Sequence, residues 1–205
     1  MATKRSASKV ARQKLALRDS IWPNLDEGSL WDRATSDGWL SVPRAMPLLL
    51  QIMDSLSKGK PLSATYLDLW CRTYDDSFVI ANKEREMAFS SGFTGERAVR
   101  TWAGRMGILA DLGFISLKSG PSGPISYVLM LNPYHVVHSL REKGAISEGL
   151  FNALNQRMVE IGADDLTELA TAAATKAAAQ STPAAPPRIR RPPKPTKKVS
   201  GNGKP

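Results

Sequence analysis

The chain of 205 residues contains one cysteine, Cys71. A single cysteine excludes a disulfide within the chain, which suits a reducing compartment. No apolar run approaches the roughly 18 residues that a membrane span needs, and the N-terminus lacks the apolar segment of a secretory signal. The first 18 residues, rich in Lys, Arg and Ser and free of acids, also fit an organelle transit peptide. We expect a cytoplasmic protein without a membrane partner.

Patterns that carry enzyme chemistry are also missing. The sequence shows no Ser/His/Asp order, no glycine-rich phosphate loop and no carboxylate pair. Cys71 falls on the apolar side of a predicted helix beside Trp70, which favours a packed thiol over a nucleophile. His135, His138 and Glu142 share a helix face, but no further ligand supports a metal site there. We predict a non-enzyme that needs neither a cofactor nor a metal.

The net charge of +9 is concentrated in the two ends of the chain. Residues 1–20 carry six basic side chains and one acid, and residues 181–205 carry seven and none, whereas residues 21–180 carry 15 basic and 18 acidic ones. Basic arms bind nucleic acid by releasing counterions from phosphates. The tail is predicted to contact phosphates, to recognise a partner in an extended proline-rich form, or only to solubilise. Its basic cluster is Arg188, Arg190, Arg191, Lys194, Lys197 and Lys198.

Residues 96–112 have the period of a two-faced helix. The apolar side consists of Ala98, Val99, Trp102, Ala103, Met106, Leu109 and Ala110. The other side carries Arg97, Arg100, Thr101, Gly104, Arg105 and Ile108. Gly113 stands where a left-handed residue closes a helix. Strands at 114–119 and 125–131, joined by a Pro/Gly turn, predict a hairpin behind it, with Ile125, Tyr127, Leu129 and Leu131 on one strand face.

A shorter helix is predicted over 82–89, with Asn82 as its N-cap. The segment Ser91-Gly92-Phe93-Thr94 then leads into the longer helix, near Gly95, with Thr94 as its N-cap and Glu96 in its first turn. Two helices joined by a glycine-containing turn of three or four residues form a helix-turn-helix.

Residues 42–133 resemble a winged helix-turn-helix domain, as found in bacterial transcription regulators and in plasmid and phage replication proteins. The resemblance rests on Ala88-x-x-x-Gly92-Phe93-Thr94, on Arg97-x-x-Arg100-x-Trp102 and on Leu109-x-x-Leu112-Gly113-Phe114-Ile115. It implies a mainly α fold with a small β-hairpin wing. It also implies sequence-specific binding of double-stranded DNA by the helix at 95–112 in the major groove, by a transcriptional regulator associated with the nucleoid.

The predicted DNA-binding residues are Thr94, Arg97, Arg100, Thr101, Gly104 and Arg105, with Lys118 and Ser119 in the wing. Arginine pairs with guanine O6 and N7, and Gly104 would let the helix backbone approach the groove. One alternative is a plasmid or phage replication or partition factor. Another is a protein-interaction module, whose arginines form a solvated surface and pair with Glu84, Glu86 or Asp111.

The segments before the domain are expected to serve it. Residues 1–20 form a basic mobile arm. Residues 21–41 form an irregular lid that lies across the domain, because Trp22, Trp31 and Trp39 are costly to leave in water. A stacking platform for single-stranded bases is the alternative for these tryptophans.

The remaining helices follow from their apolar patterns. One helix begins at Pro43 and ends near 58. A second, capped by Ser63, runs to Tyr74 with Tyr66, Leu67, Leu69, Trp70 and Cys71 on its buried side, and 78–81 is a short strand. Helices over 134–144, 146–161 and 164–180 pack back on the domain or form a homodimer through 134–161. Residues 181–205 are expected to be disordered.

Overall fold

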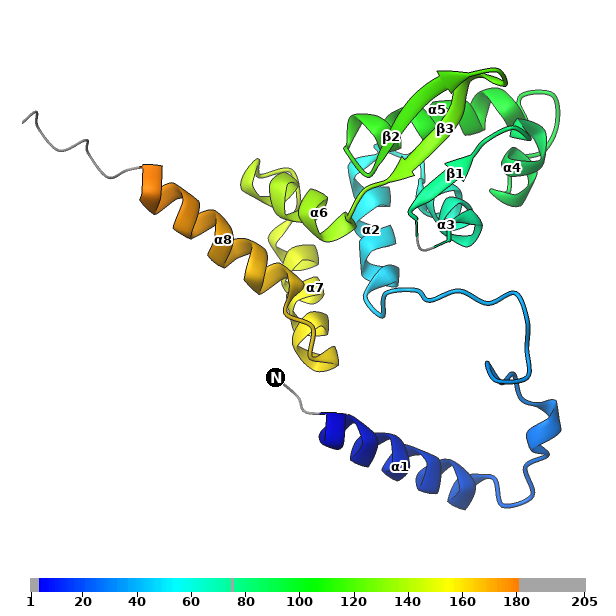
Figure 1. Cartoon of the computed structure of the whole chain (residues 1–205), viewed down its shortest axis with the longest axis vertical. Helices are drawn as coiled ribbons and strands as arrows, with labels where there is room; N and C mark the ends of the chain where they lie inside the picture. The colour runs from blue at the N-terminus through cyan, green and yellow to red at the C-terminus, as the bar shows by residue number, and fades with distance from the viewer. Residues whose placement is uncertain (1–3, 75, 181–205) are drawn as a thin grey trace, which may run out of the picture.

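Helices dominate the computed structural model, which describes residues 4–74 and 76–180 and contains one small antiparallel sheet (Figure 1). The elements are, in order, α1 (Lys4–Ile21), η1 (Glu27–Ser29), α2 (Met46–Leu56), α3 (Ser63–Arg72), β1 (Phe78–Ile80), α4 (Glu84–Ser90), α5 (Ala98–Asp111), β2 (Ile115–Gly120), β3 (Gly123–Met130), α6 (Pro133–Glu142), α7 (Glu148–Ile161) and α8 (Asp165–Gln180). None of the helices in this part of the chain is both long and apolar enough to span a membrane.

The sheet has the strand order β1-β3-β2, so the hairpin strand β3 lies in the middle. Val79 lies opposite Val128 in the β1–β3 register, and both side chains are buried. The outer face carries Phe78, 37% exposed, and Leu129, 45% exposed. The predicted hairpin is therefore confirmed, but the face that Tyr127 and Leu129 share is the outer one, because Val128 and Met130 take the core side.

One hydrophobic core joins α2, α3 and α5 to the inner face of the sheet. Trp102 and Tyr66 are fully buried, and the Tyr66 ring meets the edge of Phe114 with 6.0 Å between centroids. Burying such aromatic side chains contributes roughly 2–3 kcal/mol each before conformational entropy is counted. The predicted apolar side of residues 98–110 is thus the face that holds α5 in place.

Two predictions about α2 and α3 are wrong, namely the first residue of α2 and the cap of α3. The helix α2 begins at Met46 rather than Pro43. The Ser63 side chain makes no cap bond at the start of α3. Instead, Asp54 Oδ1 accepts hydrogen bonds from the backbone N–H groups of Leu62 at 2.6 Å and Ser63 at 2.9 Å. An acceptor from another helix has taken over the capping role, which a local sequence rule does not anticipate.

The predicted buried side of α3 is wrong in part. Tyr66 and Leu69 are buried, but Leu67 is 39% exposed and Cys71 is exposed. Leu67 and Cys71 stand four residues apart, so they share a helix edge that turns away from the core. The helix ends at Arg72, before the predicted Tyr74.

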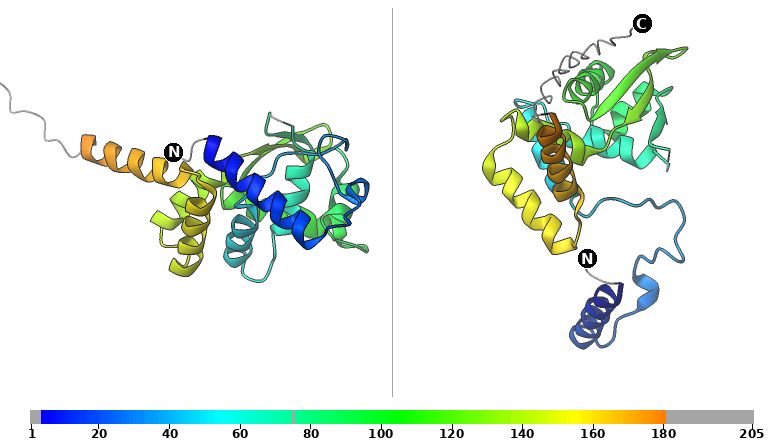
Figure 2. Two further views of the ribbon diagram at one scale, coloured as in Figure 1. Left: turned by 90° about the horizontal axis from the view of Figure 1, so that it is seen from below. Right: turned by 60° about the vertical axis from the view of Figure 1, so that its left-hand side comes forward.

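The tryptophan-rich segment does not bury its aromatic side chains. Trp22 is 58% exposed, Trp31 70% and Trp39 44%. Figure 1 and the right-hand view of Figure 2 show α1 set apart from the other helices and the sheet. A hydrogen bond ties the end of the segment to the domain, because Trp70 Nε1 donates to the Ser41 carbonyl oxygen at 3.2 Å. The predicted lid, with its tryptophans packed across the domain, is therefore corrected to an exposed connection.

The predicted helices after the sheet are confirmed. The Asn132 side chain caps α6 by accepting from Tyr134 N at 2.9 Å, and left-handed Gly144 and Gly162 follow the ends of α6 and α7. These helices pack back on the body, because α7 contacts α2 and α8 contacts α6. Pairing with a second copy through 134–161 stays a prediction. The tail predicted to be disordered, residues 181–205 with its basic cluster, lies outside the described residues.

Candidate nucleic-acid interface

The turn between α4 and α5 is longer than predicted. The helix α4 ends at Ser90 and α5 begins at Ala98, so residues 91–97 separate them instead of three or four. Gly92 is left-handed with φ +84°, and Phe93 N donates back to Ala88 O at 2.9 Å. A left-handed glycine together with this hydrogen bond is a common motif at the C-terminal end of a helix, so it ends α4. A second left-handed glycine, Gly95 with φ +80°, then delays the next helix.

The start of α5 corrects another prediction. Arg97 is the N-cap residue and makes no side-chain cap bond. The predicted cap Thr94 and the predicted first-turn acid Glu96 lie before the helix, and both are exposed. The physical cause is Gly95, because a left-handed residue cannot belong to a right-handed helix. The first turn of α5 therefore contains Arg100 and no carboxylate.

Arg97 and Arg100 are exposed and lie three residues apart on α5. Within the described residues, neither side chain makes a hydrogen bond, an ion pair or a ring contact. The carboxylates that were the alternative partners do not reach them. Glu86 pairs with Lys83 at 3.2 Å and with Arg72 at 3.8 Å. These two guanidiniums are thus available to a ligand.

Arg105 behaves differently from the other two arginines. Its Nε donates to the carbonyl oxygen of Pro61 at 3.1 Å, and its guanidinium lies 5.7 Å from the centroid of the Phe93 ring. The side chain is half-buried. Arg105 therefore ties α5 to the α2–α3 connection and to the α4–α5 turn. Of the three predicted arginines, Arg97 and Arg100 therefore have no bonded partner within the described residues, whereas Arg105 is held by contacts of its own.

Gly104 lies on the same side of α5 as Arg97 and Arg100 and is exposed. A Cβ at this position would meet no atom within 4 Å, and its φ is not left-handed. Glycine inside a helix costs about 1 kcal/mol relative to alanine. Neither packing nor backbone conformation in the described chain calls for a glycine here. Its effect is to leave the helix backbone bare, beside half-exposed Thr101.

The predicted wing residues do not join the α5 surface. Lys118 and Ser119 are exposed near the tip of the hairpin, and Lys118 lies opposite Tyr127. That register puts the Lys118 side chain on the outer face of the sheet. A Cβ at Gly120 would come within 2.6 Å of the Tyr127 ring, so the hairpin tip requires this glycine, which the sequence pattern did not single out.

The structure also leaves one arginine of α4 exposed. Arg85 on α4 is exposed and, within the described residues, has no bonded partner. Figure 1 shows α4 beside the N-terminal end of α5, with α6, α7 and α8 beyond the other end. Residues 83–86 alternate Lys or Arg with Glu, which is typical of a solvated helix face. For this reason the sequence pattern did not single out Arg85.

The other candidate chemistry stays weak. His138 Nδ1 lies 3.8 Å from Glu142 Oε2, a pair along α6. Across residues 4–74 and 76–180, no group of His, Cys, Asp or Glu side chains is arranged to hold a metal ion. No protein-family model matches the chain, and neither a curated protein nor a solved structure matches it.

Proposed function

We propose that this chain is a winged helix-turn-helix protein that binds a specific sequence of double-stranded DNA and regulates transcription. The order α3-β1-α4-α5-β2-β3, with β3 in the middle of the sheet, is compatible with that domain. The observation that carries the proposal is the pair Arg97 and Arg100. Both are exposed and unpaired within the described residues, at the end of α5 that reaches base edges in such domains.

Each part of the surface has a separate task in this proposal. Arg97 and Arg100 make bidentate hydrogen bonds to guanine O6 and N7 in the major groove. Gly104 allows the α5 backbone to come close to the DNA, while Arg105 holds the helix at its angle. Arg85 contacts phosphate from α4, the helix that crosses the backbone. Lys118 contacts phosphate from the hairpin tip.

The acidic balance of residues 21–180 limits DNA binding to this local surface. The basic ends add affinity that does not depend on base sequence, by releasing counterions. Such a protein would work in the cytoplasm, on the nucleoid. A protein-interaction module would need neither a bare α5 backbone nor unpaired arginines at the start of that helix.

The test begins with selection of bound duplexes from a random pool by the full chain. Affinity for the selected duplex is then measured by fluorescence anisotropy at several salt concentrations. A slope of log affinity against log salt near −0.9 per phosphate contacted is expected. R97A and R100A should each lose about 1–3 kcal/mol of binding free energy and relax the preference at one base pair.

Arg44, exposed and unpaired within the described residues, lies beside the start of α2, so R44A is the matched control. Replacing Lys194, Lys197 and Lys198 by Gln should weaken all duplexes alike. The proposed role of α5 is wrong if R97A and R100A bind like the parent chain while the tail variant alone loses affinity.

A further inference from the structure

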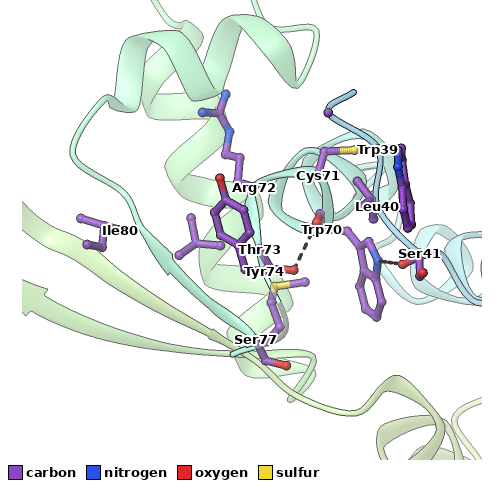
Figure 3. Close-up of a pocket in the computed structure, with 13 residues that line it drawn as sticks. Trp39, Leu40, Ser41, Trp70, Cys71, Arg72, Thr73, Tyr74, Ser77 and Ile80 are labelled. Carbon is purple, nitrogen blue, oxygen red and sulfur yellow. Dashed lines mark hydrogen bonds between the residues drawn. The ribbon is translucent and has the colours of Figure 1, made fainter. Parts of the chain in front are cut away.

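A groove lies between the end of α3, the strand β1 and the segment 38–41 (Figure 3). Its volume is about 890 Å³. The hydrogen bond from Trp70 Nε1 to the Ser41 carbonyl oxygen anchors segment 38–41 against α3, so this segment forms one wall. Figure 3 shows Trp39 on one side of the groove and Ile80 on the other. The DNA-binding proposal uses none of these residues.

The groove walls present large apolar and aromatic side chains to solvent. Tyr74 is 86% exposed, Ile80 58% and Trp39 44%, and Trp70 is half-buried. Exposed apolar side chains that gather on one surface of a protein mark a place where another protein element binds.

The charge around the groove favours a basic occupant. Among the lining residues, all of which belong to the described chain, Arg72 is the one cation. Its guanidinium already pairs with Asp68 at 2.9 Å and with Glu86 at 3.8 Å. Two exposed acids, Asp37 and Asp76, each stand next in sequence to a lining residue. An occupant with a positive charge at its edge therefore fits this surface best.

The helix α1 has an apolar stripe that stays open to solvent. At 100° per residue, Val10, Leu17 and Ile21 lie within about 40° of one another around the helix axis. They are 49%, 60% and 55% exposed. Figure 1 and the right-hand view of Figure 2 show the whole helix set apart from the sheet and the other helices. An amphipathic helix binds by laying such a stripe into an apolar groove.

The stripe is accompanied by positive charge. Residues 4–21 carry six basic side chains and one acid, and this acid pairs with Arg18 at 2.7 Å. Lys14 stands four residues after Val10 and three before Leu17, so it lies along the edge of the stripe. Its side chain is exposed and makes no hydrogen bond or ion pair within the described residues.

We infer that α1 of a second copy of this chain occupies the groove, and that two molecules exchange their α1 helices across a two-fold axis. The apolar stripe then covers the aromatic walls, and Lys14 lies near the acids Asp37 and Asp76. Both surfaces are open in one molecule, and both are filled in the pair. The inference goes beyond the proposed function and does not depend on it. It also uses a surface other than 134–161.

The connection between α1 and the groove allows this exchange. Residues 22–37 join α1 to segment 38–41, so the arm leaves from a wall of the groove itself. This connection can span at most about 50 Å. A compact body of the size of residues 42–180 is roughly 40 Å across. An arm that starts at one groove therefore reaches the groove of a second molecule that touches the first.

The first test is the oligomeric state of the full chain, measured by sedimentation equilibrium over a range of concentrations. The parent chain should dimerise, and L17E on the stripe and I80E in the groove should each weaken the dimer. A single substitution alters both contacts of a two-fold pair, so a tenfold loss per contact becomes about a hundredfold rise in the dimer Kd. Ala16 is exposed and lies about 100° or more from the stripe, so A16E is the matched control and should dimerise like the parent chain. Circular dichroism checks that all variants keep their helices.

The sole thiol of the chain gives the second test, because Cys71 lines the groove and is exposed. Chains that carry C71A with V10C, L17C or I21C are mixed in turn with the parent chain and oxidised by diamide. At least one mixture should form a disulfide between α1 of one chain and Cys71 of the other, identified by mass spectrometry of the linked peptides. A16C/C71A is the matched control and should react at least about tenfold more slowly, because a disulfide needs Cα atoms within about 7 Å.

A chain that stays monomeric at every concentration would overturn the inference. A dimer that L17E and I80E leave intact would also overturn it, and would assign pairing to another surface such as 134–161. An L17C chain that keeps Cys71 and closes a disulfide within one molecule at high dilution would assign the groove to the molecule's own α1, against the exchange.

Discussion

Arg105 Nε donates a 3.1 Å hydrogen bond to Pro61 O, joining α5 to the connection between α2 and α3. R105A should lower the free energy of unfolding by about 1–2 kcal/mol, because a charge-assisted hydrogen bond and the contact with Phe93 are lost. R100A, on an exposed unpaired side chain, should change stability by less than about 0.5 kcal/mol. Urea unfolding compares the two. Equal effects on stability would contradict the distinction between a held arginine and an available one.

Gly104 is the position where stability and binding should move in opposite directions. G104A should raise the free energy of unfolding by about 0.5–1 kcal/mol, because alanine favours the helix and its Cβ meets no atom within 4 Å. The same methyl group should weaken binding of the selected duplex. Gly149 on α7 is also exposed with open space at its Cβ, so G149A is the matched control. A G104A chain that binds DNA as tightly as G149A would remove Gly104 from the interface.

Asp54 rather than Ser63 should stabilise the start of α3. D54A removes the acceptor of two backbone N–H groups and should cost about 1–3 kcal/mol. S63A should be nearly neutral, because the Ser63 hydroxyl makes no cap bond. Thermal unfolding followed by circular dichroism measures both. If S63A lost more stability than D54A, Ser63 rather than Asp54 would be the cap of α3.

Tyr66 should make stability fall at alkaline pH. Burial raises the pKa of its phenol above the ordinary value of 10.0, and its hydroxyl has no hydrogen-bond partner within the described chain. The folded pKa exceeds the unfolded one, so this contribution to stability is complete below about pH 10 and decreases as the pH rises above it.

Y66F removes both the titrating group and the unsatisfied hydroxyl. At neutral pH it should be at least as stable as the parent chain, with a gain on the order of 1 kcal/mol. The advantage of Y66F should widen above about pH 10. Urea midpoints at neutral and alkaline pH test this, and a gap that does not change with pH would count against ionisation of a buried Tyr66.

Much of the fold follows from signals that lie close together in the chain. The apolar period of residues 98–110 marks the buried face of α5, and Gly113 and Gly144 mark two helix ends with left-handed φ of +88° and +69°. The Pro/Gly turn after 119 marks the hairpin. These features depend on neighbours within a few residues, where backbone sterics and hydrogen bonding decide the outcome.

The arrangement of polar side chains was decided between distant segments. Asp54 replaced Ser63 as a cap, Arg105 found Pro61 O across 44 residues, and Arg97 and Arg100 remained unpaired within the described chain. The tryptophans at 22 and 31 stayed exposed, and Trp39 came to line the same groove as Tyr74, a residue of a distant segment.

The sequence by itself determined which helices and strands form and the apolar face of α5, since local geometry sets both, but it did not fix the starts of α2 and α5 or the buried side of α3. Only the tertiary structure decided which charged groups are free to meet a ligand, because a side chain's partners are chosen by proximity in space and by burial, neither of which is local.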